Sequence, residues 1–204
     1  MPGLRSEMNM KPDVAGAGTI RVWTIQPTAW WRSLRSGRVL HGDGRRICSH
    51  FRPAYRWLMR QMATRVPGYR GCFPVWVWES PKPDLRHAGH LPRGEAGARV
   101  ELEIPHSRIL LFDFETWHCV LNRWHLSLSW RESLDWDRRI KGLDQYRAPL
   151  PEPFESELQA TWDRVFDLDR LRRTKLWGPI DEIQGVTEYV RLDEVRRVEE
   201  FVAR

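Results

Sequence analysis

The chain has 204 residues, and its 33 lysines and arginines against 27 acidic residues give a formal net charge of +6. With a hydrophobic fraction of 41%, the chain is long enough for one sizeable core and short for two, so we expect one domain. No stretch approaches the roughly 18 apolar residues of a membrane helix, so we expect no membrane contact and a cytoplasmic location. Three widely spaced cysteines without a CxxC pair favour free thiols over disulfides or a zinc site.

The N-terminal residues 1–18 mix glycine, proline and methionine without periodicity. Such composition is typical of a disordered tail. The rest of the chain, residues 19–204, carries alternating strand patterns and helical patterns in turn, with no internal repeat. We therefore expect one α+β domain with a mixed, mainly antiparallel sheet and packed helices.

The first predicted element is a strand over residues 19–26, because apolar residues alternate there. Thr24 and Gln26 share one face of this strand, and Trp23 lies on the other. A short helix follows and ends at Gly37, a residue that commonly terminates helices. The later predicted elements are a helix over 53–66, strands over 74–79, 100–104 and 108–112, helices after Asp113, from Ser129 and over 154–165, and strands over 183–192 and 196–202.

The loop over residues 80–97 is rich in proline, glycine, histidine and charge, and it is too long for a tight turn. Its Lys82-Pro-Asp-Leu-Arg86 segment has the residues to hold a phosphate group, so Arg86 is a candidate ligand contact. The alternative is a local ion pair between Asp84 and Arg86.

The segment over 183–192 carries an unusual pattern, since alternation places Gln184 and Glu188 on a face with apolar residues. A carboxylate on such a face must be paired or line a cleft, because burying it alone costs several kcal/mol. Gln184 and Glu188 are therefore candidate catalytic residues. The alternative is that this face is solvated and the opposite face forms the core.

The segment after Asp113 places His118 and Asn122 four residues apart on one helical face. We expect Asp113 to cap this helix. His118 and Asn122 would then tie down a loop or border the site. His118, Cys119 and His125 match no familiar zinc spacing, so no metal is expected. P-loop, GxSxG, HExxH and GxGxxG motifs are also absent from the sequence.

Several short segments lie in order along the predicted domain and together form a recognisable pattern. They are Val22-Trp-Thr-Ile-Gln26, Ala54-Tyr-Arg-Trp57, Gln61-Met62, Pro74-Val-Trp-Val-Trp78, Lys82-Pro-Asp-Leu-Arg86, Leu102-Glu-Ile-Pro105, Leu110-Leu-Phe-Asp113, Trp117-His118, Val120-Leu-Asn122 and Ile183-Gln184. Taken together, these segments resemble a bacterial family known as domain of unknown function 3841 (DUF3841). This resemblance implies no activity.

A more distant resemblance is to the ADP-ribosyltransferase fold, especially bacterial toxins that modify nucleic acid. It rests on the first strand, the helix that ends at Gly37, and the final strand pair around Glu188. The resemblance implies NAD as substrate and Glu188 as the carboxylate that stabilises positive charge on the ribose. Thr24 stands where that family has His or Arg, and Gln26 where it has Thr or Ser. The implied NAD-binding residues are Trp23, Thr24, Gln26, Tyr55 and Arg86.

The sequence thus supports three hypotheses: a toxin-like or phage-defence ADP-ribosyltransferase that acts on nucleic acid or protein, a non-catalytic nucleic-acid-binding module, and a partner protein such as an antitoxin. The transferase hypothesis predicts that Thr24, Gln26 and Glu188 face a common concavity. It also predicts that Glu188→Gln removes activity while stability hardly changes. The excess of arginine predicts affinity for nucleic acid that falls steeply with salt.

Overall fold

The computed structural model describes residues 18–81, 84, 86, 90–146 and 149–204. Residues 1–17 of the predicted tail and most of the Lys82–Arg86 segment therefore lie outside the described residues. The elements are β1 (Thr19–Pro27), α1 (Thr28–Arg35), α2 (Arg52–Arg65), β2 (Val75–Trp78), β3 (Ala96–Pro105), β4 (Ile109–Asp113), α3 (Phe114–Leu121), α4 (Trp130–Arg139), α5 (Phe154–Trp162), α6 (Leu168–Arg173), β5 (Ile183–Thr187) and β6 (Val195–Val202).

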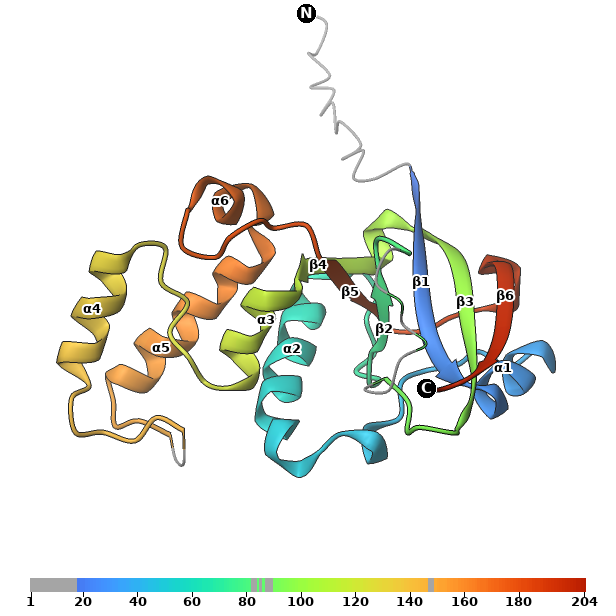
Figure 1. The fold of residues 1–204 in the computed structure, drawn as a ribbon, viewed down its shortest axis with the longest axis horizontal. Coiled ribbons are helices and arrows are strands. Elements are labelled where there is room, and N and C mark those ends of the chain that lie inside the picture. The colour runs from blue at the N-terminus through green and yellow to red at the C-terminus, as the bar shows by residue number, and fades with distance from the viewer. Residues whose placement is uncertain (1–17, 82–83, 85, 87–89, 147–148) are drawn as a thin grey trace, which may run out of the picture.

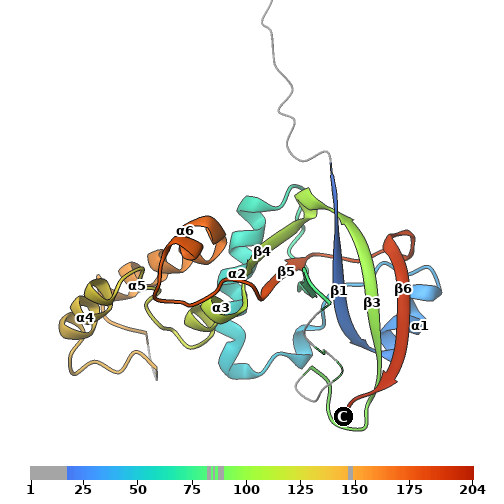
Figure 2. The ribbon, with the colours of Figure 1, turned by 45° about the horizontal axis from the view of Figure 1, so that its top comes forward.

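The strands form a six-stranded sheet in the order β4-β5-β2-β1-β3-β6. The predicted α+β class is confirmed. Every neighbouring pair of strands is antiparallel, so the expectation that the sheet mixes parallel and antiparallel pairs is wrong. The long strands β1, β3 and β6 run side by side (Figure 2). Helices α4, α5 and α6 group together beyond α2 and α3 (Figure 1). Within the described residues, no helix is long and apolar enough to cross a membrane.

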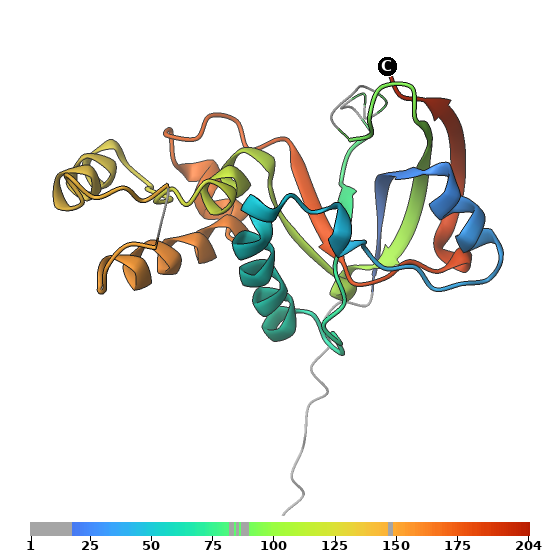
Figure 3. The ribbon, with the colours of Figure 1, turned by 90° about the horizontal axis from the view of Figure 1, so that it is seen from below.

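Each face of the sheet is covered by an apolar core. On one face, Leu34 of α1 belongs to a buried cluster with Val22 and Val100. On the other, Trp117 of α3 belongs to a larger cluster with Phe112 and with residues of α2 and α5. Figure 3 shows α1 beside β1, β3 and β6, whereas α2 lies next to β4 and β5. Because both faces are covered, the strands carry apolar residues at successive positions and not only at alternate ones.

Tryptophans supply much of the larger core. The side chain of Trp76 meets Tyr55, Phe112 and Trp117 with ring centroids 5.4–5.7 Å apart. Such tilted and edge-on pairs stabilise a fold beyond the area they bury, by about 0.5–1.5 kcal/mol each. Of the 12 tryptophans, only Trp124 and Trp130 are exposed, so most of them are structural, as expected.

Two element predictions near the C-terminus are wrong. The strand expected over 183–192 ends at Thr187, because the chain bends at Glu188. Val190 then pairs with Leu40 in an isolated bridge. Helix α6 was not expected, since its six residues carry only two leucines and show no apolar period.

The predicted N-cap of α3 is confirmed, because Asp113 Oδ1 accepts a hydrogen bond of 2.9 Å from the Thr116 amide. We predict that Asp113→Ala lowers the free energy of unfolding by about 1 kcal/mol, measured by chemical denaturation. Asp113→Asn retains an oxygen acceptor and serves as the control, with a smaller loss. Equal losses in the two variants would show that the cap hydrogen bond is not the cause.

His125 links stability to pH. Its ring stacks on Trp136 with centroids 4.5 Å apart, and burial lowers its pKa in the folded protein. A lowered pKa means that the stabilisation is present above the unfolded value near 6.5 and is lost as pH falls through the folded value. We predict that His125→Gln makes the melting temperature less dependent on pH between about 7 and 5. An unchanged pH dependence would contradict this assignment.

Candidate functional site

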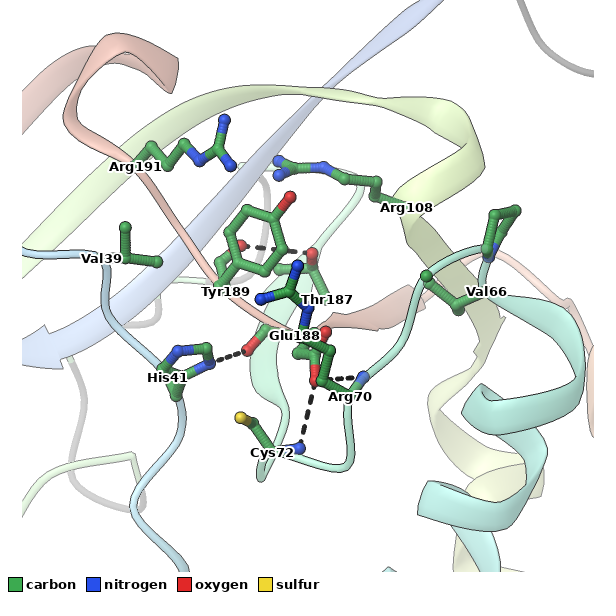
Figure 4. A pocket seen from close by; sticks show the side chains of 12 residues that line it. Val39, His41, Val66, Arg70, Cys72, Arg108, Thr187, Glu188, Tyr189 and Arg191 are labelled. Atoms are coloured by element: carbon green, nitrogen blue, oxygen red, sulfur yellow. Dashed lines mark hydrogen bonds between the residues drawn. The ribbon is translucent and has the colours of Figure 1, made fainter.

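Glu188 is a buried carboxylate at the point where β5 ends, with 4% of the residue exposed. Its Oε1 atom accepts hydrogen bonds from the backbone amides of Arg70, at 2.7 Å, and Cys72, at 3.1 Å. Its carbonyl oxygen accepts a bond from His41 Nδ1 at 2.9 Å, which requires the tautomer protonated at Nδ1. Glu188 therefore joins three separate connections of the chain (Figure 4).

These connections enclose a cavity of about 570 Å³. Its walls come from the segment after α1, the connection between α2 and β2, the residue before β4, and the residues after β5 (Figure 4). A volume of this size falls in the range of small-molecule and cofactor sites. The lining residues are Val39, His41, Val66, Pro67, Gly68, Arg70, Cys72, Arg108, Thr187, Glu188, Tyr189 and Arg191.

Positive charge dominates the cavity wall. The guanidinium carbons of Arg108 and Arg191 lie 4.3 and 5.0 Å from the centroid of the Tyr189 ring. Arg108 also forms an ion pair with Glu194. Arg70 and Arg191 form no ion pair with any residue that the structure describes. Two guanidinium groups in the cavity are therefore left without a carboxylate partner.

The groups beside Glu188 stay protonated. Burial and the negative charge of Glu188 raise the pKa of Tyr69 to about 12. The same two causes raise the pKa of the Cys72 thiol. The Tyr69 hydroxyl donates a hydrogen bond of 2.8 Å to the Cys72 carbonyl, which accounts for its orientation. Cys72 is thus a neutral thiol at pH 7 and lacks the thiolate that a nucleophilic cysteine needs.

Thr24 and Gln26 do not share this cavity with Glu188. Strand register places Trp23 opposite Trp78 and Trp78 opposite Gln184, so these three side chains share a face and Thr24 lies on the other. Thr24 Oγ1 donates to the Trp76 carbonyl at 2.7 Å, and Gln26 Nε2 donates to Thr24 Oγ1 at 2.9 Å. Neither residue is among those that line the cavity beside Glu188, so the expected common concavity is not found there.

Gln184 and Trp23 also lie outside the residues that line the cavity. Gln184 is 5% exposed, and its Nε2 atom has no hydrogen-bond partner among the described residues. Trp23 is half-buried and lines a small depression of about 40 Å³ together with Arg99, Glu101 and residues of β6. Gln184 and Trp23 lie on the same face of the sheet, but neither of them lines the cavity beside Glu188.

The remaining two predicted contacts lie elsewhere. Tyr55 on α2 is half-buried against Trp76 and Trp117, and burial raises the pKa of its hydroxyl. Arg86 forms ion pairs with Asp84, at 2.7 Å, and Glu199, at 3.0 Å. The local ion pair considered for the long loop is therefore formed, and Arg86 lies outside the residues that line the cavity.

No metal centre is apparent in the parts of the chain that the structure describes, since they hold no cluster of three histidine, cysteine or acidic side chains. His118 Nδ1 donates to the Phe114 carbonyl at 3.0 Å, within its own helix. Asn122 forms the C-cap of that helix. Neither residue lines the cavity, so the expectation that they border the site beside Glu188 is not met.

Arginines of the cavity were missed by sequence reasoning because they share no spacing. Arg70, Arg108 and Arg191 come from three connections that are far apart in the chain. The available signal was weak: Tyr189 and Arg191 follow Glu188 closely, and the glycines at 68 and 71 mark a turn with positive φ angles. These two glycines allow the chain to turn so that the Arg70 and Cys72 amides reach the carboxylate.

The comparisons with known proteins give a family and no activity. The model of the domain of unknown function DUF3841 matches residues 21–196, which is most of the chain. No curated protein matches it, and neither does any solved structure.

The hydrogen bonds of the Glu188 carboxylate predict that substituting this residue lowers the stability of the fold. This differs from the expectation that the stability of Glu188→Gln hardly changes. Glu188→Ala leaves the Arg70 and Cys72 amides without an acceptor, and we predict a loss of about 1–3 kcal/mol in unfolding free energy. Glu188→Gln keeps one acceptor oxygen, so the predicted loss is about 1 kcal/mol. Chemical denaturation measures both, with the exposed Glu200→Ala as control, whose loss stays within about 0.5 kcal/mol. Wild-type stability in Glu188→Ala would contradict this role.

Proposed function

The chain belongs to the DUF3841 family, and we propose that it binds the phosphate groups of a nucleotide, NAD, in the cavity beside Glu188. One observation carries the proposal: three arginines face one cavity, and two of them have no ion-pair partner among the described residues. Guanidinium groups bind phosphate oxygens in pairs, so a pyrophosphate would satisfy charges that the folded chain leaves uncompensated.

The cavity also offers contacts for the sugar and the base of a nucleotide. The carboxylate of Glu188 is held by two hydrogen bonds that it accepts from backbone amides, so its orientation does not depend on a ligand. A carboxylate accepts hydrogen bonds from ribose hydroxyls. The Tyr189 ring and the His41 ring, 6.2 Å apart between centroids, are the aromatic surfaces of the cavity. A phosphate-binding wall, an acceptor and two rings together match the parts of NAD.

The reaction that we propose for this site is transfer of ADP-ribose to an acceptor. The bond between nicotinamide and ribose breaks, and the electron pair leaves with nicotinamide, so positive charge develops on the ribose. A nucleophilic atom of the acceptor then forms a new bond to the same ribose carbon and releases its proton to water. The carboxylate of Glu188, which lines the cavity, would stabilise this charge. Thr24 and Gln26 take no part in this version of the mechanism, because neither of them lines the cavity. The ADP-ribosyltransferase-like fold remains part of the proposal.

Ligand-induced thermal shifts test the binding step. We predict that NAD and ADP-ribose raise the melting temperature and that adenosine, which lacks phosphate, does not. Replacing Arg70 and Arg191 together by Gln removes most of this shift, because the free guanidinium groups are lost. Replacing the exposed Arg131 and Arg173 by Gln changes the net charge equally and leaves the shift intact. An equal shift with adenosine, or equal losses in both variants, would contradict the proposed phosphate contacts.

Nicotinamide release tests the chemical step separately. We predict that Glu188→Gln lowers the rate about a hundredfold or more while the shift caused by ADP-ribose remains, since the charge acts on the reacting ribose. Rates are compared at equal folded concentration, because the substitution also costs some stability. A thermal shift without release of nicotinamide from the wild-type protein would favour the binding module without catalysis.

A further inference from the structure

Helix α2 carries three arginines that the fold does not explain. Arg52, Arg56 and Arg60 recur every four residues, so they form one stripe, and all three are exposed. The opposite side of the helix, which includes Trp57 and Leu58, is buried in the larger core. The stripe therefore faces solvent along a helix that lies at the centre of the molecule (Figure 1).

This arrangement works against the stability of the helix. Like charges four residues apart destabilise a helix, and a positive charge in the first turn opposes the helix dipole. The first turn of α2 has no acidic residue, and the helix as a whole contains none. None of the three arginines forms an ion pair with a residue that the structure describes. An anionic partner would remove this repulsion.

Two grooves run along the stripe, and Arg56 lines both of them. The first, of about 550 Å³, includes Arg52 and the ring of Phe73, which is 39% exposed. The second, of about 350 Å³, includes Arg60 and the ring of Tyr146, which is 58% exposed. Each groove therefore combines free guanidinium groups with an accessible aromatic ring.

The Phe73 ring is held in place by its surroundings. A side chain on Gly44 would come within 2.4 Å of the ring, which shows that the ring packs directly on the backbone there. The acidic residues that line the grooves are already paired, Asp43 with Arg45 and Glu155 with Arg123. The positive charge of Arg52, Arg56 and Arg60 is thus available to a ligand.

We propose that the arginine stripe of α2 and the two grooves beside it bind single-stranded nucleic acid, with phosphates on the arginines and bases on Phe73 and Tyr146. Each groove places guanidinium groups beside an aromatic ring, the combination that single-strand-binding surfaces use. A duplex keeps its base faces stacked on each other, so the two rings would find no partner in it. The site is separate from the cavity beside Glu188 and does not rest on NAD binding.

Binding of labelled 12-nucleotide DNA and RNA strands, measured by fluorescence anisotropy over a salt series, tests the proposal. The wild-type protein binds a single strand more tightly than the matching duplex. Replacing Arg52, Arg56 and Arg60 by Gln lowers the slope of log affinity against log salt by about 2, since each phosphate contact on a single strand contributes about 0.7. Replacing Phe73 and Tyr146 by Leu weakens binding at least about fivefold, because stacking is lost.

A charge-matched control carries Gln at Arg131, Arg170 and Arg173, which are exposed on α4 and α6. It keeps the wild-type slope. The stripe variant melts at or above the wild-type temperature, because like-charge repulsion along α2 is relieved. Equal slope changes in the stripe and control variants, duplex binding as tight as single-strand binding, or no binding at low salt would each overturn the proposal.

Discussion

The buried carboxylate of Glu188 is the constraint from which the candidate site is built. Glu188 follows the last residue of β5, and its carboxylate accepts hydrogen bonds from two backbone amides of the connection between α2 and β2. Its backbone carbonyl accepts a hydrogen bond from His41, in the segment after α1. A carboxylate that is removed from water needs such compensation, because otherwise its desolvation would cost several kcal/mol. The cavity exists because these three connections meet at one residue, and its positive wall surrounds the negative charge at their junction.

Positive charge is distributed unevenly over the molecule, and both candidate sites adjoin α2. Many surface arginines form ion pairs, such as Arg45 with Asp43 and Arg138 with Asp135. The unpaired ones that we single out lie along α2, in the connection that follows it and, in the case of Arg191, after β5. Because α2 is also buried against the tryptophan-rich core, the groups that it carries are held on a rigid element. A net charge of +6 alone would not have indicated this concentration.

Local rules predicted most of the elements but not the site. Alternation located β1, and the N-caps at Asp113 and Ser129 located α3 and α4. The same alternation failed after Thr187, since the hydrogen bonds of the Glu188 carboxylate with a distant loop end the strand. A pattern of period two describes which residues share a face only as long as the strand continues.

The sequence by itself determined the α+β class, the order of most elements and the need for compensation at Glu188, because these follow from local periodicity and from the cost of burying charge. It also determined the family, through the match of the family model to residues 21–196. Only the tertiary structure decided which groups meet. Trp78 pairs with Trp23 on one side and with Gln184 on the other, so Gln184 shares a face with Trp23, and Thr24 lies on the opposite face. This register is set by packing across the sheet. The arginines of the cavity come together because separate loops converge, and no spacing in one chain records that convergence.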